Sequence, residues 1–279
     1  MLTIPQTLQL QARTAAERVQ QLRTPGRLML AGMLAGAYIG VGIVVMVSAA
    51  GPLLAAGDGL AKLVGGLVFG VALTLVMFAG ADLATSAMMV LPQGLLMRSV
   101  RPGQATGTLL ASFAFNLLGA LAFSALVVMA GVLRFAPAAT TMLSDLLAAR
   151  ATASPLELFA RGVLCNALVC LAVWMSARVR SELAKIALIF VAIAAFVISG
   201  FEHVVANMTI YGLGLLLGDA NATWGLFGGN LLWVGLGNLV GGGLLIGAAY
   251  WVIGGRPRYE GVDSGVSRAT GEERLEHAQ

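Results

Sequence analysis

Charged residues are scarce in this sequence of 279 residues, where they make up only 11% of the chain. Soluble domains carry roughly 25% charged residues, so the composition excludes an ordinary water-soluble fold. Hydrophobic residues make up 58%, and they gather in long runs separated by short polar connections. Because a chain in lipid must satisfy its own backbone hydrogen bonds, we predict an all-α membrane protein that crosses the bilayer several times.

Cysteine and histidine are equally scarce, with two residues of each kind. Cys165 and Cys170 are five residues apart in one apolar run, too far along a helix for an unstrained disulfide. A single buried histidine, His203, makes a poor metal site without a second His or Cys nearby. We therefore expect no metal and no other cofactor.

Motifs that would indicate an enzyme are also missing from the sequence. We find no phosphate-binding loop, no nucleophile elbow and no zincin pattern, so we predict that the protein is not an enzyme. The basic residues are dispersed among the connections, and the net charge of +4 therefore does not indicate a nucleic-acid partner.

The apolar runs predict a transmembrane transporter domain over residues 27–254 with six spans, at 28–50, 60–96, 109–133, 156–175, 186–217 and 226–253. Residues 1–26 alternate apolar and polar groups, which is typical of an amphipathic helix lying along the cytoplasmic face of the bilayer. We expect Arg13, Arg18 and Arg23 of this helix to face the lipid headgroups. A long loop is expected over 134–155, and a disordered cytoplasmic tail over 255–279.

Basic residues are distributed unequally between the two sides of this six-span arrangement. Thirteen of the 17 Lys and Arg lie in the N-terminal segment, the second-to-third and fourth-to-fifth connections and the tail. Cytoplasmic connections of membrane proteins carry an excess of Lys and Arg. We therefore predict that both termini are cytoplasmic.

Two of the six spans contain an acidic residue in the middle of an apolar run. Asp82 and Glu202 each close a Gly-x-acid sequence, and Asn116 and Asn238 begin Asn-x-x-Gly sequences 34 and 36 residues further on. This order predicts a 3+3 inverted repeat with two broken helices that meet near the membrane midplane. Asp82 and Glu202 are expected to support the breaks by capping freed backbone N–H groups.

Non-helical backbone at membrane depth survives where it is buried in protein or lines a wet cavity, so the two breaks predict a pore. His203 lies beside Glu202, and an ionisable group at this depth is by default a functional hypothesis. An asparagine in such a span can either line the pore or join neighbouring helices by hydrogen bonds, and both roles are open for each one named here. The polar residues expected at the pore are His203, Thr85, Asn166, Asn207 and Asn238, and the apolar ones expected at its constrictions are Phe69, Leu73, Leu83 and Phe196.

Four stretches of the sequence resemble signatures of the formate/nitrite transporter family: residues 81–86, 164–175, 200–208 and 237–243. The resemblance extends over about residues 25–254 and favours the nitrite branch. It implies an aquaporin-like protomer of six helices, one pore per protomer, and a homopentamer in the lipid bilayer of the bacterial plasma (inner) membrane. The implied substrates are small monovalent anions of weak acids, namely nitrite and formate, and hydrosulfide or lactate in some relatives.

The same resemblance implies roles for single residues. His203 is similar to the family's central pore histidine and Thr85 to its partner, while Arg150 falls near a basic residue that attracts anions into the vestibule. Asn166 and Asn238 match pore asparagines, and the four apolar residues match constrictions. Ala84 departs from the family, which often has Phe at this position, so the width of that constriction is an open question.

A bare anion loses its hydration in an apolar constriction, at a cost of order tens of kcal/mol for an isolated buried ion. Protonating an acid of pKa about 3.5 at pH 7 costs roughly 5 kcal/mol, so we expect the anion to be protonated at His203 and to pass as a neutral acid. The alternative mechanism keeps His203 neutral and lets the anion pass by hydrogen bonding alone. Alternative functions are a hydrosulfide or other weak-acid channel and a neutral-solute, aquaporin-like pore.

Overall fold

The computed structural model describes residues 1–261, which form helices and short connections without any strand. The predicted disorder of the tail falls mostly on residues 262–279, outside this described part. In chain order the helices are α1 (Ile4–Gln20), η1 (Gln21–Arg23), α2 (Pro25–Ala55), α3 (Ala61–Phe78), α4 (Ala84–Leu96), α5 (Pro102–Met129), α6 (Pro137–Ala151), α7 (Pro155–Arg178), α8 (Glu182–Ile198), α9 (Val204–Leu217), α10 (Trp224–Val240), the π-helix η2 (Gly241–Ala248) and α11 (Ala249–Ile253).

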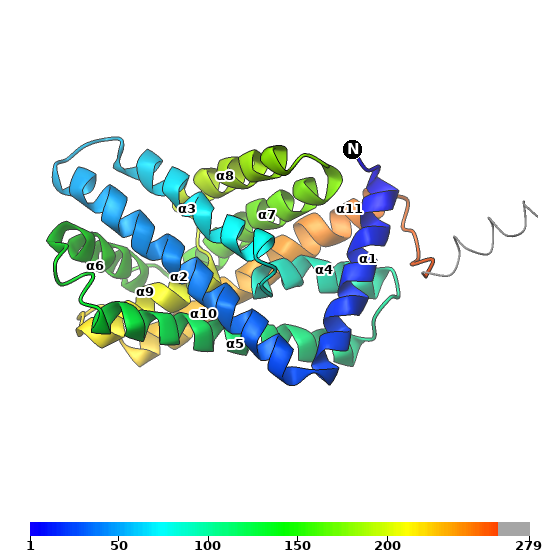
Figure 1. Ribbon diagram of the computed structural model, residues 1–279, viewed down its shortest axis with the longest axis horizontal. Coiled ribbons are helices and arrows are strands. Elements are labelled where there is room, and N and C mark those ends of the chain that lie inside the picture. The colour runs from blue at the N-terminus through cyan, green and yellow to red at the C-terminus, as the bar shows by residue number, and fades with distance from the viewer. Residues whose placement is uncertain (262–279) are drawn as a thin grey trace, which may run out of the picture.

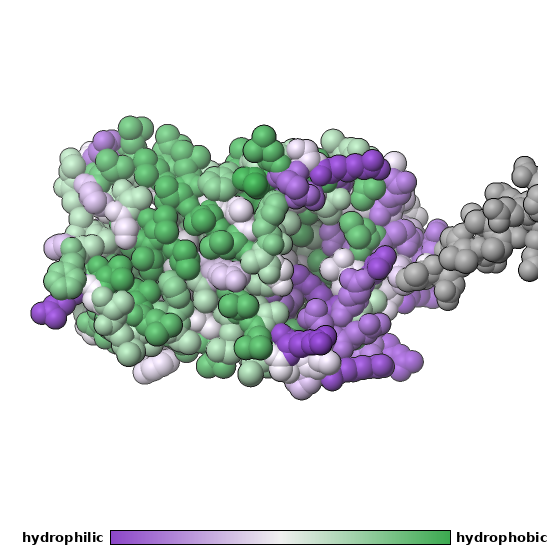
Figure 2. Space-filling model, in the orientation of Figure 1, coloured by the Kyte–Doolittle hydropathy of each residue, from purple (hydrophilic) through white to green (hydrophobic). Residues whose placement is uncertain are grey.

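Most of the helices are apolar. Within residues 1–261, five are long and apolar enough to cross a membrane: α2, α3, α5, α7 and the continuous helix made of α10, η2 and α11. Hydrophobic side chains cover most of the visible surface, and hydrophilic ones gather at the end that contains α1 (Figures 1 and 2). The prediction of an all-helical fold built from apolar helices is therefore confirmed.

Two helical segments are interrupted at mid-length. Residues 79–83 separate α3 from α4, and residues 199–203 separate α8 from α9. Gly80 and Gly200 have φ angles of 74° and 71°, a left-handed conformation that glycine adopts without steric cost. Each interruption thus follows the Gly of a Gly-x-acid sequence.

Residues 134–155 contain the helix α6, so the prediction of a long loop there was wrong. Ala139, Leu143 and Leu147 recur every fourth residue and are buried, which gives α6 one apolar stripe. The backbone of α6 lies so close to α2 that a Cβ atom added at Gly51 would be 2.7 Å from the carbonyl oxygen of Ala138. This docking on a distant segment stabilises a helix that is too short to cross the membrane.

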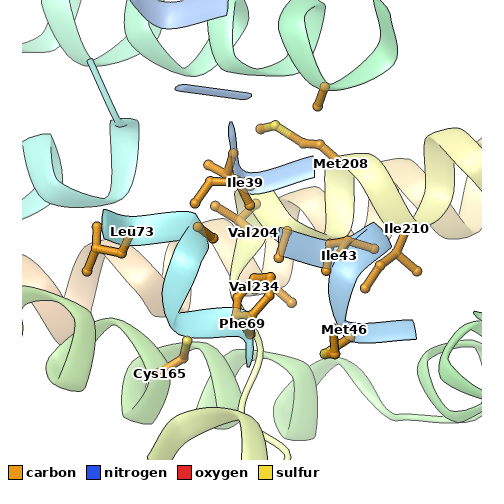
Figure 3. Packing of buried hydrophobic residues seen from close by; sticks show 14 of the residues in the cluster. Ile39, Ile43, Met46, Phe69, Leu73, Cys165, Val204, Met208, Ile210 and Val234 are labelled. Atoms are coloured by element: carbon orange, nitrogen blue, oxygen red, sulfur yellow. The ribbon is translucent and has the colours of Figure 1, made fainter. Parts of the chain in front are cut away.

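Buried hydrophobic residues join α2, α3 and α9 into one core. Ile39, Ile43 and Met46 follow one face of α2 and lie near Phe69 and Leu73 of α3 (Figure 3). Side chains from the first turns of α9 complete this cluster. The core therefore fixes α3 beside the start of α9, where the second interruption ends.

Helix α1 crosses one end of the bundle and α6 lies at the opposite end (Figure 1). A C-terminal strap, residues 254–261, holds α1 through one side chain: Gln9 Nε2 donates to Arg258 O at 2.9 Å, and Glu260 N donates to Gln9 Oε1 at 3.2 Å. The strap thereby fastens the first helix of the chain with its last described residues. The apolar face that α1 turns to the bundle consists of Leu8, Ala12, Ala15 and Val19.

Candidate functional site

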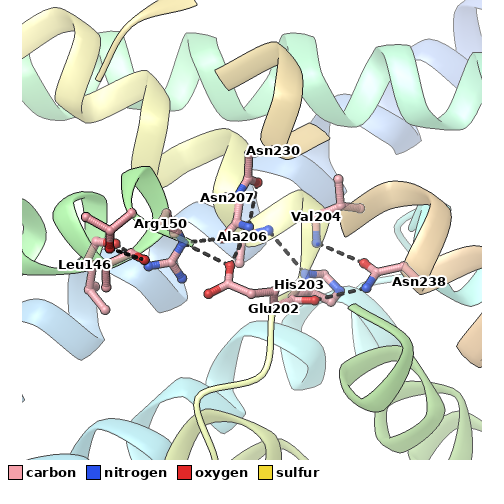
Figure 4. Close-up of polar contacts among 11 residues, drawn as sticks. Leu146, Arg150, Glu202, His203, Val204, Ala206, Asn207, Asn230 and Asn238 are labelled. Atoms are coloured by element: carbon pink, nitrogen blue, oxygen red, sulfur yellow. Dashed lines mark hydrogen bonds and ion pairs between the residues drawn. The ribbon is translucent and has the colours of Figure 1, made fainter. Parts of the chain in front are cut away.

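Asn238 of α10 holds the interruption between α8 and α9. Its Oδ1 accepts a hydrogen bond from Val204 N at 2.9 Å, while its Nδ2 donates to Glu202 O at 2.9 Å and Gly162 O at 2.8 Å (Figure 4). Asn238 is fully buried. All three bonds go to backbone, so the Asn238 amide connects α7, α9 and α10.

Asn116 of α5 holds the interruption between α3 and α4 in the same way. Its Oδ1 accepts from Ala84 N at 2.9 Å, and its Nδ2 donates to Asp82 O at 2.8 Å and Gly32 O at 3.0 Å. Asn116 is also fully buried. The freed N–H groups of Ala84 and Val204 are thus bonded by asparagines, and not by the acidic residues that the sequence analysis expected to cap them.

The acidic residues instead face arginines from the two end helices. Glu202 Oε2 lies 3.0 Å from Arg150 Nε of α6 and accepts from Asn207 Nδ2 at 2.7 Å (Figure 4). Asp82 Oδ1 lies 3.5 Å from Arg18 Nη1 of α1, and its second oxygen accepts from the Ser112 hydroxyl. A buried carboxylate without a partner is costly, so these contacts stabilise both acids at membrane depth.

Arg18 does not face the lipid headgroups, and that expectation was wrong. Its side chain is only 16% exposed, and its Nη2 donates to Ser86 Oγ of α4 at 3.0 Å. Arg13 on the opposite face of α1 is 59% exposed and pairs with Glu17. The difference arises because α1 buries one face against α4, and Arg18 lies next to that face.

His203 is the residue before α9 and is almost fully buried. Its Nδ1 accepts a hydrogen bond from Ala206 N at 3.1 Å, so this nitrogen carries a lone pair. A neutral ring then has its proton on Nε2, which lies 2.9 Å from Thr85 Oγ1. If Nε2–H donates to Oγ1, the hydroxyl hydrogen of Thr85 is left for another acceptor.

Two of the predicted apolar residues, Phe69 and Phe196, lie on one side of the His203–Thr85 pair. The Phe196 ring stacks on the His203 ring with a centroid distance of 6.1 Å, and Phe69 meets Phe196 edge to face at 6.0 Å. Leu83 is fully buried. It is the residue before α4, as His203 is before α9.

A cavity of about 200 Å³ opens from His203 towards α6. Six residues predicted for the site come together around it, and Arg161 lines it as well. The six are Phe69, Arg150, Phe196, Glu202, His203 and Asn207.

A second cavity, of about 190 Å³, lies on the α1 side. Leu73 and Ser86 line it together with Arg18. Phe69 and Leu73 are one helical turn apart on α3, so the two cavities approach the same part of α3 from opposite ends of the bundle. The remaining predicted residues, Asp82, Thr85, Leu83, Asn166 and Asn238, line neither cavity.

Asn166 of α7 binds the backbone behind Thr85. Its Nδ2 donates to Thr85 O at 3.1 Å and to Asn238 O at 2.7 Å, and its buried Oδ1 has no hydrogen-bond partner among residues 1–261. The amide therefore fixes the first turn of α4 against α10.

Three residues near the site were missed by the sequence analysis: Arg18, Ser112 and Arg161. Each of the first two carried a signal of its own in the sequence. Arg18 lies in the helix before the first span, as Arg150 lies in the helix before the fourth span. Ser112 lies one helical turn before Asn116 on the same helix. No local pattern distinguished Arg161 from an ordinary residue at the membrane boundary.

Apolar helices interrupted around a buried polar pair, with a cavity on either side, define a membrane transport protein. The family model described as "Formate/nitrite transporter" matches residues 5–252. The chain therefore belongs to the formate/nitrite transporter family.

Individual relatives and solved structures agree with this assignment. The chain is 37% identical over 239 residues to the nitrite transporter NirC of Escherichia coli (strain K12), covering 85% of this chain and 87% of that protein. A solved "FNT family ion channel" superposes with a TM-score of 0.82 at 33% identity, covering 88% of this chain and 98% of the channel. A "Pentameric formate channel with formate bound" superposes with a TM-score of 0.71 at 28% identity, covering 83% of this chain and 98% of the channel.

Proposed function

We propose that this protein carries nitrite and formate, small monovalent anions of weak acids, across a bacterial inner membrane. The observation that carries this proposal is the 2.9 Å contact between Thr85 and His203, with an arginine-containing cavity on either side. The family description names both anions, and the similar NirC protein is named a nitrite transporter. This last likeness favours nitrite as the preferred substrate.

We infer that six crossings form two inverted sets of three. The crossings are α2, α3 with α4, α5, α7, α8 with α9, and α10 with η2 and α11. The matched backbone bonds of Asn116 and Asn238 support this repeat, as do the arginines supplied by α1 and α6, the helix before each set. The hydrophilic α1 end (Figure 2) supports a cytoplasmic position for this end and for both termini. The similar formate channel is pentameric, which supports a homopentamer for this chain.

The interrupted helices favour an anion over a neutral solute. Helices α4 and α9 begin at Ala84 and Val204, and their first turns meet where Thr85 contacts His203. The N-terminus of a helix carries roughly half a positive charge. Two such ends beside one point lower the electrostatic cost of an anion there.

Protonation of the anion at the Thr85–His203 pair is favoured by the apolar side chains on either side of it. Phe69, Phe196 and Leu73 offer no hydrogen bond to a passing ion, whereas protonation of a weak acid of pKa about 3.5 costs roughly 5 kcal/mol at pH 7. The anion accepts the hydrogen bond of the Thr85 hydroxyl, takes a proton there and passes as the neutral acid. His203 remains neutral, because a proton on Nδ1 would break its bond with Ala206 N. The transferred proton therefore comes from solution through the cavity that His203 lines, and not from His203 itself, which revises the expectation that the histidine protonates the anion.

The proposal is tested with purified protein in liposomes that contain a pH-sensitive dye. Labelled nitrite and formate are expected to enter faster than into liposomes without protein, with about one proton moving per anion. Uptake no faster than in protein-free liposomes would refute transport. Anion uptake without proton movement would leave transport intact but exclude protonation of the anion at the Thr85–His203 pair.

A further inference from the structure

An apolar pocket of about 270 Å³ lies beside the α6-side cavity, at the end of the bundle that contains α6 (Figure 1). Its walls come from four segments: the end of α2, the start of α3, the middle of α6 and the end of α8. Four residues line both this pocket and the α6-side cavity: Met46, Leu146, Val197 and Gly200. His203 and the described arginines do not line the pocket, so the passage of an anion does not explain it.

The wall of this pocket is mostly apolar and continues to the outer surface of the bundle. Leu54 of α2 and Ile198 of α8 line the pocket and are 42% and 37% exposed. Helix α6 packs mainly on α2 and α9, which leaves this space between α6 and the ends of α3 and α8. Lipid tails are as apolar as the leucine and isoleucine side chains of this wall. An acyl chain entering from the bilayer therefore has the chemistry to fill the pocket.

Two side chains of opposite charge belong to the lining, Lys62 of α3 and Asp145 of α6. Both are exposed, and neither forms an ion pair among residues 1–261, with the other or with any third group. The charged residues of the adjoining cavity differ, because Arg150 pairs with Glu202 and Arg161 with Glu157. A lysine and an aspartate that share one pocket without pairing suit a ligand that carries both charges.

We propose that this pocket binds one zwitterionic phospholipid with a primary ammonium group, phosphatidylethanolamine, and takes up part of an acyl chain. Lys62 carries a compact charge on a flexible stem and binds the lipid phosphate. Asp145 accepts charge-assisted hydrogen bonds from the lipid ammonium group. Phosphatidylglycerol has the same phosphate but no ammonium group, so it offers Asp145 no partner. The bound lipid joins α6 to the start of α3 and the end of α8.

Native mass spectrometry of the purified assembly, titrated with one lipid at a time, tests this specificity. The first lipid bound per chain is expected to be held about fivefold more tightly when it is phosphatidylethanolamine than when it is phosphatidylglycerol, since one ion pair near the surface is gained. Asp145→Asn should abolish this preference, and Lys62→Gln should weaken the binding of both lipids. Arg134→Gln is the matched control, because Arg134 is exposed and lies outside the pocket. Equal affinity of the wild type for the two lipids, or unchanged binding in Lys62→Gln, would overturn the proposal.

A cysteine placed in the lining tests the position of the lipid. Cys165 and Cys170 are fully buried, so a maleimide reacts chiefly with Ser199→Cys, at an exposed position that lines the pocket. Phosphatidylethanolamine is expected to slow this reaction more than phosphatidylglycerol does, and Lys62→Gln should remove the protection. An unchanged rate would mean that the lipid binds elsewhere, and a cysteine unreactive without lipid would mean that a second copy of the chain covers the pocket. Either result would overturn the proposal, and neither depends on which anion the protein carries.

Discussion

Replacing Thr85 by valine is expected to lower the uptake of nitrite and formate at least tenfold. Valine has nearly the same shape as threonine, so the packing of α4 is preserved. The hydroxyl that lies 2.9 Å from His203 Nε2 is lost, and a substrate anion loses the donor that we propose it meets. A hydrogen bond to a charged group contributes about 1.5–3 kcal/mol, and 1.4 kcal/mol corresponds to a factor of ten. Initial rates in proteoliposomes measure the effect.

Thr85→Ser is the matched control for this experiment, because it keeps the hydroxyl and removes only a methyl group. Its uptake should stay within a few-fold of wild type. If Thr85→Val transports as fast as Thr85→Ser, the hydroxyl takes no part in the passage of the anion. Size-exclusion chromatography of each variant shows whether the assembly is intact.

The second large effect is expected on stability, from Asn238→Ala. The Asn238 amide bonds Val204 N, Glu202 O and Gly162 O in the buried interior. Alanine leaves these three backbone groups without their partner, and each unsatisfied buried group costs about 1–3 kcal/mol. We expect the free energy of unfolding to fall by about 4 kcal/mol, measured by titration with a denaturing detergent.

Asn116→Ala should lower the free energy of unfolding by a similar amount, because Asn116 makes the corresponding bonds at the other interruption. Leu236→Ala, two residues from Asn238 and 43% exposed, serves as a control and should cost much less. A loss below about 1 kcal/mol for either asparagine variant would mean that other groups or water take over these bonds.

The sequence predicted the parts of the structure that depend on strong local signals. A Gly-x-acid sequence inside an apolar run located both interruptions, because a charged side chain at membrane depth is costly in an uninterrupted, lipid-facing helix. His203 was singled out because an imidazole is rare at this depth, and the structure brings it together with Thr85, Phe69 and Phe196.

Features that depend on docking between distant segments could not be predicted in this way. Helix α6 is stabilised by packing on α2, and the inward direction of Arg18 depends on which face of α1 meets α4. The bonds of the Asn238 amide to backbone groups are a further example, because an asparagine in an apolar helix could equally line a pore. Only the spatial neighbours of these residues decide between such alternatives.

The strap over α1 has a consequence for the order in which the molecule is assembled during synthesis. Gln9 leaves the ribosome among the first residues, but its partners Arg258 and Glu260 emerge about 250 residues later. The bonds between Gln9 and the strap can therefore form only after nearly the whole bundle has been synthesised, whereas the packing of α1 on α4 needs only the first part of the chain. The strap thus closes over a helix that α4 already holds through Ser86 and Arg18, and this closure is among the last events in the maturation of each newly made chain.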